Sequence, residues 1–325
     1  MKTIVPSPFA DCNAVLKHEK SKMPFRKEMF EYEHLYYECE QTKEHFTTSE
    51  LSGLNIGQVY NQYRAAHDIP FPDELITTRK AYGITARQMS KALGFGENQY
   101  GLYERGEMPS LSNGKMLKIA MDPTAFAHLI EDGKIKERIL KLARTFDPVN
   151  DFKQKLVFDG YKRGKYNGFA PQSMAKIRNV ILYFVKALGP TFQTKMNKLL
   201  FYADYESYRT QGISITGLAY KALPFGAVPV NFDKIYALVD DIENIPVEES
   251  NYSGIKLQSA ALPDMSQFTQ AEADILAEVT ERFKTYSSSR ISEENHKESA
   301  WLNNIGNRGI INYQEAFNLQ IPEQS

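Results

Sequence analysis

The sequence predicts an α+β protein that is mainly α with small β elements. Three observations lead to this fold class. Residues 1–55 contain polar and aromatic runs that alternate, as in "MFEYEHLYYE", which is typical of a small antiparallel sheet. Residues 70–122 hold short amphipathic segments separated by glycines. From Ser173 onward, apolar residues recur at helical spacing up to a Gly189-Pro190 stop.

Composition and charge limit the classes of protein that fit. A chain of 325 residues with 42% hydrophobic content can form two or three domains with separate cores. The net charge of −1 means that contact with nucleic acid needs a local basic patch. The sequence lacks an apolar leader and any run near the roughly 18 apolar residues that cross a bilayer. We therefore expect a cytoplasmic protein without membrane contact.

Breaks in periodicity predict the domain boundaries. The segment from about 147 to 170 is rich in Gly, Lys and Asp and has little periodicity, which is typical of a linker. The expected divisions are a β-rich module at 1–55, a helical module at 70–122, a helix and linker at 123–170, and an α+β domain at 171–325.

The β-rich module contains the two cysteines of the chain, which without other ligands are too few to close a tetrahedral zinc site. In "FADC" and "YYEC" the residues three positions before Cys12 and Cys39, where a CxxC knuckle would have its other cysteine, are Phe9 and Tyr36. Three histidines occur in the same region, His18, His34 and His45; they are not well placed to replace two thiolates, and a zinc site that they complete is the alternative. We expect no metal and no cofactor, with vestigial cysteines and aromatic packing in place of the metal.

The helical module has the order of a helix-turn-helix. Thr85 and Gln88 form a capping box, so a helix begins at Ala86, and "GFG" makes a turn before a second helix from Glu97. We expect Leu102 to pack back on the first helix. In this geometry the second helix enters the major groove of DNA.

Seven residues are the candidate DNA contacts: Thr85, Arg87, Gln88, Asn98, Gln99, Tyr103 and Arg105. The amides of Asn98 and Gln99 suit adenine, whereas Tyr103 and the arginines would lie nearer the phosphates. The alternative is a module that serves only as a dimerisation scaffold.

The stretch "TARQMSKAL", a glycine turn, "NQYGLYERG" and "LSNGKMLKIA" resembles helix-turn-helix domains of the Xre/Cro class. It is more similar to the C-terminal half of the MqsA-type antitoxins, whose "N-x-x-x-x-Y-E-x-G" pattern is matched by Asn98, Tyr103, Glu104 and Gly106. Leu102 stands where that family has arginine, which leaves the operator sequence open. The resemblance extends to residues 1–55, where the family has a zinc ribbon.

The C-terminal region contains a long amphipathic helix, "MNKLLFYADYESY". Its apolar face holds Met196, Leu199, Leu200 and Ala203, and we expect Lys195, Lys198 and Asp204 to lie off that face. A turn at Gly212, a short strand "LAYKALP" and then "FGAVPVNFDKIY" follow.

This run resembles the SocA-like (Panacea) antitoxin domain, which has "K-L-L-Y-x-A-D" followed by a "G-P-V" turn; Ala227 replaces its proline. A second block begins with a capping box of Thr269 and Glu272. It continues with Ile291, Ser292, His296 and Trp301 in that family's "L-S-x-x-x-H-x-x-x-x-W" pattern. The resemblance covers most of residues 170–320.

Together these resemblances imply an antitoxin of a type II toxin–antitoxin system that represses its own operon. The implied partners are a cognate toxin protein, palindromic operator DNA and a second copy of the chain in a homodimer. The candidate toxin contacts are Lys198, Tyr202, Tyr205 and Phe225, although aromatic residues such as Tyr208 in the same region could equally fill the core.

An enzyme is not expected. No P-loop, HExxH or GxSxG motif is present, and His296 has no nucleophile or paired carboxylate spaced around it, so we expect a structural histidine with satisfied hydrogen bonds. Two other functions stay open: a stand-alone regulator of a phage or mobile element, and a protease adaptor.

Overall fold

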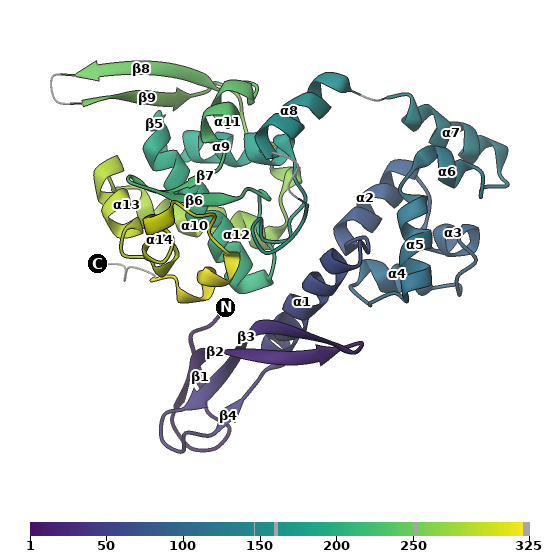
Figure 1. Cartoon of the computed structure of the whole chain (residues 1–325), viewed down its shortest axis with the longest axis horizontal. Helices are drawn as coiled ribbons and strands as arrows, with labels where there is room; N and C mark the ends of the chain where they lie inside the picture. The colour runs from purple at the N-terminus through teal and green to yellow at the C-terminus, as the bar shows by residue number, and fades with distance from the viewer. Residues whose placement is uncertain (146, 159–161, 250–251, 321–325) are drawn as a thin grey trace. The chain divides into compact units, whose positions relative to one another are not determined.

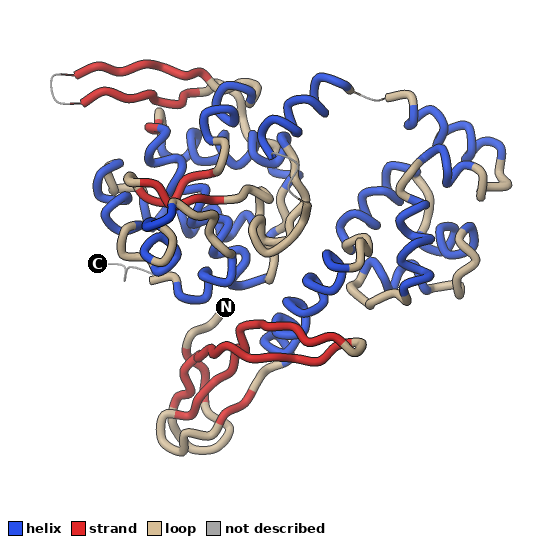
Figure 2. The backbone as a smooth tube through the Cα atoms, viewed as in Figure 1, coloured by secondary structure: helices blue, strands red, loops and turns tan. Residues whose placement is uncertain are grey.

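The computed structural model describes residues 1–145, 147–158, 162–249 and 252–320, and it confirms the α+β class (Figures 1 and 2). The chain forms two compact units. One contains Met1–Gln58 with Asn150–Ser325, and the other contains Val59–Val149. The divisions fall within helices α1 (Ser49–Ala66) and α8 (Pro148–Phe158). The four predicted domain boundaries stay predictions.

The N-terminal residues form an antiparallel sheet in the order β1-β2-β3-β4, as the alternating pattern predicts. Its strands are β1 (Ile4–Pro6), β2 (Asn13–Phe25), β3 (Glu28–Cys39) and β4 (His45–Phe46). β2 and β3 pair continuously from Ala14 opposite Cys39 to Phe25 opposite Glu28. The hairpin closes through Arg26 and Lys27, whose φ angles of 48° and 70° are those of a tight two-residue turn.

Helix α1 covers the backbone of β3 through two amide side chains. Asn55 accepts from Leu35 N (2.9 Å) and donates to Leu35 O (2.9 Å), and Gln58 bonds the N and O of Glu33 at 3.1 and 2.8 Å. Because β4 pairs only with the end of β3, these side chains satisfy backbone groups that have no strand beside them.

The second unit is a bundle of short helices. They are α2 (Pro72–Tyr82), α3 (Ala86–Ala92), α4 (Gln99–Glu104), α5 (Leu111–Ala120), α6 (Pro123–Ala127) and α7 (Gly133–Ala143). The capping box predicted at Thr85 is present and starts α3 at Ala86. The next helix begins at Gln99 rather than Glu97. Tyr100 and Tyr103 supply its main buried side chains, whereas Leu102 is half-buried.

The rest of the first unit surrounds α10 (Gln193–Gln211). Its helices are α8, α9 (Met174–Leu188), α11 (Phe232–Leu238), α12 (Gln270–Phe283), α13 (Ser288–Asn295) and α14 (Ser299–Leu302), with 3-10 turns η1 (Met265–Gln267), η2 (Ile305–Asn307) and η3 (Tyr313–Asn318). Strands β5 (Thr191–Phe192), β9 (Tyr252–Gln258) and β8 (Glu243–Glu249) form one sheet, and β6 (Tyr220–Leu223) and β7 (Gly226–Pro229) form a hairpin. The predicted linker therefore contains a helix, α8.

Helix α10 is buried from Met196 to Tyr208, including the polar residues that its periodicity places outside the core. The Asp204 carboxylate accepts hydrogen bonds from Ile215 N (2.9 Å), Thr216 N (2.7 Å), the Thr216 hydroxyl and the Tyr220 hydroxyl (2.7 Å). Burial raises its pKa to about 6. The prediction for Asp204 was wrong because tertiary donors, which periodicity cannot detect, make burial of this carboxylate tolerable.

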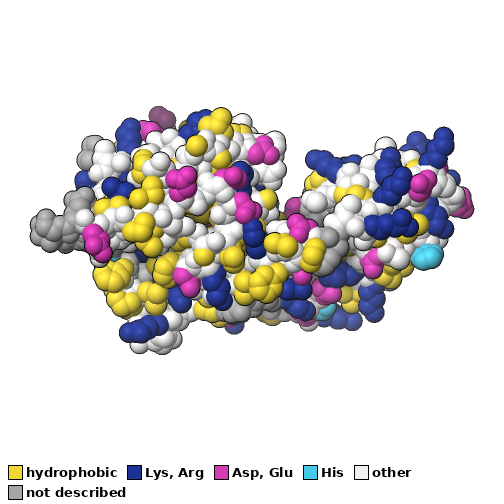
Figure 3. All heavy atoms as spheres, turned by 90° about the horizontal axis from the view of Figure 1, so that it is seen from above, with side chains coloured by type: hydrophobic (Ala, Val, Ile, Leu, Met, Phe, Trp, Pro, Cys, Tyr) yellow, Lys and Arg dark blue, Asp and Glu magenta, His cyan; other side chains and the backbone are white. Residues whose placement is uncertain are grey.

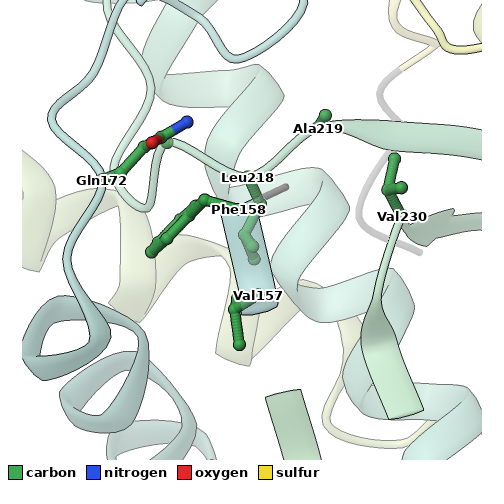
Figure 4. A pocket seen from close by; sticks show the side chains of 7 residues that line it. Val157, Phe158, Gln172, Leu218, Ala219 and Val230 are labelled. Carbon is green, nitrogen blue, oxygen red and sulfur yellow. The ribbon is translucent and has the colours of Figure 1, made fainter. Parts of the chain in front are cut away.

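A small apolar pocket lies where the end of α8 packs against the chain before β6 (Figure 4). Its volume is about 10 Å³, and it is lined by Val157, Phe158, Gln172, Gly217, Leu218, Ala219 and Val230. This volume is close to that of one water probe, so the pocket is a packing void rather than a ligand site. In the described ranges, no helix is long and apolar enough to cross a membrane.

Candidate functional site

The β6–β7 hairpin presents an exposed aromatic ring at its tip. Leu223 pairs with Gly226, so Pro224 and Phe225 form a two-residue loop, and the Phe225 side chain is 76% exposed. Exposed Leu302 (54%) lies on α14, which packs beside both strands (Figure 1). An exposed phenylalanine on a tight hairpin has no core to fill, so the tip is a candidate contact surface.

Two buried polar side chains hold this hairpin from beneath. Lys198 Nζ donates to Ala227 O (2.9 Å), and Asn295 Oδ1 accepts from Ala227 N (2.6 Å). Gly226 has a φ of 98°, and a Cβ there would lie 2.5 Å from Lys198 Cε and 2.6 Å from Asn295 Oδ1. Only glycine fits this position, and both backbone groups of the next residue are fixed.

The alanine at position 227 is what makes this arrangement possible. Proline, which the SocA-like pattern has at this position, lacks an N–H and could not donate to Asn295. The departure from the family pattern thus adds a hydrogen bond between β7 and α13.

Burial changes the protonation chemistry of Lys198. Its side chain is fully buried, and desolvation lowers its pKa from 10.5 to about 7. Among the described residues, no carboxylate forms an ion pair with it. The prediction that Lys198 lies off the buried face was wrong, because α10 is covered on that side by β7 and α13.

His296 and Trp301 fix the other strand of the hairpin. Their rings stack with centroids 4.2 Å apart, and Trp301 Nε1 donates to Leu223 O (2.8 Å). Burial, followed by the nearby Lys198 ammonium, lowers the pKa of His296, while a hydrogen bond to the Pro224 backbone opposes the shift. His296 Nε2 is buried without a hydrogen-bond partner in the described chain, so the prediction of a satisfied histidine holds for only one of the two nitrogens.

Lys198, Asn295, His296 and Trp301, which hold the two strands of the hairpin, together form the hairpin frame. A second buried network lies next to this frame. The Tyr202 hydroxyl donates to Glu298 Oε1 (3.2 Å), and Gln320 N donates to Glu298 Oε2 (3.0 Å). Burial raises the pKa of Glu298 to about 7. Asn295 Nδ2 faces Tyr202 but makes no hydrogen bond of good geometry within the described ranges.

Of the four candidate toxin contacts, the structure exposes one. Lys198, Tyr202 and Tyr205 are all buried, as is Tyr208, whereas Phe225 is exposed. Tyr205 stacks on Phe201 with centroids 4.1 Å apart, so the alternative that these rings fill the core is the correct one for the tyrosines. The expectation of surface anchors from α10 was wrong, and contact with a toxin through Phe225 stays a prediction.

The candidate DNA contacts on α3 are exposed around the start of that helix. Thr85, Arg87 and Gln88 all face solvent, with Thr85 and Gln88 bonded to each other in the capping box. Arg87 forms an exposed ion pair with Glu97.

On α4, Asn98 is exposed as the N-cap residue, and Gln99 Nε2 donates to Glu107 (3.0 Å). Arg105 is exposed and lies beside Gly101.

Tyr103 does not belong with these exposed residues. Its ring is buried against Phe95, and its hydroxyl accepts from Asn113 Nδ2 (2.7 Å). Placing it near phosphates was wrong, because it packs the inner face of α4. Its neighbour Glu104 forms a two-point ion pair with Arg79, at 2.6 and 3.2 Å.

The glycine of the same pattern also has a structural role. Gly106 follows the end of α4 with a φ of 101°, and its carbonyl accepts from Arg64 (2.7 Å). The "Y-E-x-G" part of the pattern therefore builds the bundle instead of reading a ligand.

A basic helix that the motif search missed lies beside the start of α3. Helix α7 and its C-cap carry Lys134, Lys136, Arg138, Lys141 and Arg144, and Figure 3 shows basic side chains gathered at the α6–α7 end. Arg138 Nη2 donates to Gly83 O (2.9 Å), just before the Thr85 cap. Residues 59–149 have 13 Lys and Arg against 11 Asp and Glu, a formal charge of +2. Helical spacing of these basic residues is the signal that could have identified the helix.

The two cysteines of the N-terminal sheet lie in contact, with their sulfurs 3.4 Å apart. No group of three or more His, Cys, Asp or Glu side chains gathers around a common point in the described chain. His18 bonds Glu33 and His45 bonds Glu38. Phe9 packs on Phe46, and Tyr36 stacks on His45; replacement of a metal by these rings stays a prediction.

Comparison with known proteins identifies one part of the chain. No curated protein and no solved structure matches it. Residues 196–302 match the model of the family described as "Antitoxin SocA-like, Panacea domain". The match runs from α10 to α14 and includes the hairpin, Lys198, Asn295, His296 and Trp301. It supports an antitoxin-family role for this region.

Proposed function

We propose that this protein is the antitoxin of a type II toxin–antitoxin pair. It binds its cognate toxin through the C-terminal domain and represses its own operon through residues 70–122. The match of residues 196–302 to the SocA-like family carries the proposal. The resemblance of residues 1–55 and 70–122 to MqsA-type antitoxins supports the second role.

The β6–β7 tip is the proposed toxin contact. Phe225 is exposed, and the strands on either side are fixed by Trp301 at Leu223 and by Lys198 and Asn295 at Ala227. A large ring on a rigid support binds with little loss of conformational entropy, which is the usual character of an interface anchor.

The test is growth rescue and pull-down with the product of the adjacent gene. Because residues 1–58 form one unit with residues 150–325, full-length point variants are cleaner than truncations at 150. We expect Phe225→Ala to weaken toxin binding about 30-fold, corresponding to the roughly 2 kcal/mol of an interface anchor. Leu262→Ala, which removes another exposed apolar side chain (66%), is the matched control. Equal binding by both variants would remove the tip from the interface, and failure of the wild type to rescue would refute the antitoxin role.

Operator binding is proposed for the exposed residues of α3 and α4, in a homodimer on a palindrome. We expect Asn98→Ala to lose about 1–3 kcal/mol of discrimination at one base pair. Arg87→Ala should weaken binding to all sequences alike and reduce the salt slope by about one. The control is Lys118→Ala on α5, which removes an ammonium that pairs with Asp68. Binding unchanged in the first two variants favours the scaffold alternative, and loss of toxin binding in Asn98→Ala would place the toxin on α4.

A further inference from the structure

The only two cysteines of the chain meet, although 27 residues separate them. Cys12 precedes β2, and Cys39 is the last residue of β3. Pairing of Ala14 with Cys39 in the β2–β3 ladder brings the loop before β2 beside the end of β3. The Sγ atoms are 3.4 Å apart, which is about the contact distance of two sulfurs and within reach of a bond after small side-chain rotations.

Hydrogen-bond donors surround one of the two sulfurs. Thr42 N donates to Cys39 Sγ (3.4 Å), and the Ser7 and Thr42 hydroxyls also bond this sulfur. Ser7 makes the largest contribution, and together these donors lower the pKa of Cys39 to about 6. Burial raises the pKa of Cys12, so the pair holds a thiolate at Cys39 and a thiol at Cys12.

The two cysteines differ in their exposure to solvent. Cys39 is fully buried, whereas Cys12 is partly exposed. An oxidant in solution therefore reaches Cys12 first, and Cys39 is already deprotonated beside it. The side chains that complete the cluster are hydroxyls, which are poor substitutes for the thiolate and imidazole ligands of zinc.

We propose that Cys12 and Cys39 form a reversible disulfide when the protein meets hydrogen peroxide or a related peroxide. A solvent base removes the proton of the Cys12 thiol, and the resulting thiolate attacks one peroxide oxygen and breaks the O–O bond. Cys12 becomes a sulfenic acid, and the hydroxide that leaves takes up that proton and becomes water. The Cys39 thiolate then attacks the Cys12 sulfur and forms the S–S bond, and the sulfenic oxygen leaves as hydroxide and takes a proton from solvent to become the second water. One thiol and one thiolate together lose two electrons, and one peroxide, the thiol proton and one solvent proton become two waters.

The bond would connect the β1–β2 loop to the end of β3 and so close the open end of the long β2–β3 hairpin. The far end is already closed by the turn at Arg26 and Lys27. Oxidation would thus stiffen the module that packs against α1, and a reducing thiol would restore the original state.

The experiment uses the full-length protein treated with hydrogen peroxide, denatured in acid, labelled with a maleimide and weighed by mass spectrometry. We expect both thiols to disappear together, the peptides of Cys12 and Cys39 to be joined within one chain, and dithiothreitol to restore both. The reaction should be at least about 10-fold faster in the folded protein than in urea, because the fold holds the two sulfurs together. Independent oxidation of the two cysteines, crosslinks between chains only, or equal rates in urea would overturn the proposal.

Two variants test the separate roles of Cys12, which is oxidised first, and of Cys39 with its hydrogen-bond donors. Cys39→Ser should leave Cys12 as a sulfenic acid that a dimedone probe captures, with no intramolecular bond. Thr42→Val keeps both cysteines and removes one hydroxyl donor, so it should slow disulfide formation about 10-fold, corresponding to one hydrogen bond to a charged group. An unchanged rate in Thr42→Val would reject the role of the donors. Purified protein that holds about one zinc per chain on these cysteines would replace the disulfide with a metal site.

Discussion

The buried lysine beneath the hairpin makes the stability of the C-terminal region depend on pH. Lys198→Met keeps a side chain of similar length and removes the charge. In the folded protein the pKa of Lys198 is about 7, against 10.5 when the side chain is exposed. Between these values the unfolded chain binds one more proton than the folded chain, so unfolding becomes less favourable as pH rises. Below about pH 7 both states carry the proton, and the dependence levels off.

The size of this pH dependence follows from the change in the pKa of Lys198 on folding. One pKa unit corresponds to about 1.4 kcal/mol, so a change from 10.5 to about 7 amounts to roughly 5 kcal/mol across the window. The free energy of unfolding should rise by about 1.4 kcal/mol for each pH unit in the middle of this range. Lys198→Met loses the hydrogen bond to Ala227, worth about 1 kcal/mol, but has no such dependence on pH.

The assay is urea unfolding followed by tryptophan fluorescence. Trp301 is the only tryptophan of the chain and lies in the hairpin frame, so its signal reports this region and not the helical unit. Cys39, whose pKa is lowered from 9.0 to about 6, contributes a dependence of the same sign, and comparison of wild type with variant cancels it. Unfolding midpoints that run parallel between about pH 7 and 10 in the two proteins would refute the reasoning.

Three further substitutions test the frame and the bundle. Asp204→Asn replaces one carboxylate oxygen with an NH2 group, which cannot accept the hydrogen bonds donated to that oxygen. The free energy of unfolding in urea should fall by about 3–5 kcal/mol, and a decrease below about 1 kcal/mol would contradict this. Gly226→Ala should lower stability by about 2–4 kcal/mol in thermal melting. Gly94→Ala, which has a similar left-handed φ (69°) but open space, should cost only about 1 kcal/mol. Arg79→Met should cost about 3 kcal/mol by circular dichroism, and adding Glu104→Leu should recover much of that loss.

Features with local causes could be predicted from the sequence. The capping boxes of Thr85 with Gln88 and of Thr269 with Glu272 set helix starts that the structure confirms, because both partners lie within one turn. The alternation in "MFEYEHLYYE", residues 29–38, predicts the strand found at Glu28–Cys39, because the side chains of a strand point alternately to its two faces.

Features with distant causes could not be predicted. The burial of Lys198 depends on Ala227 and Asn295, which lie far along the chain, and a lysine in an amphipathic pattern is ordinarily assigned to the surface. Tyr103 looks like an exposed phosphate contact until Asn113 is seen to bond its hydroxyl. Phe225 is the reverse case of Lys198. Its side chain is apolar but exposed, because it lies in the two-residue loop at the tip of the hairpin.

These contacts also explain why the resemblances identify a fold more readily than a partner. Lys198, Asp204, His296 and Trp301 match the SocA-like pattern, and each holds backbone or rings in place inside the domain. In the helical unit, Tyr103, Glu104 and Gly106 have the same role. The residues that can touch another molecule lie elsewhere, at the hairpin tip and on the open faces of α3, α4 and α7. Since the frame needs only a glycine turn and fixed backbone groups at position 227, the tip can vary without disturbing the core. Under the proposed antitoxin function, the choice of toxin would therefore depend on a few exposed side chains, whereas the motif residues build the support that presents them.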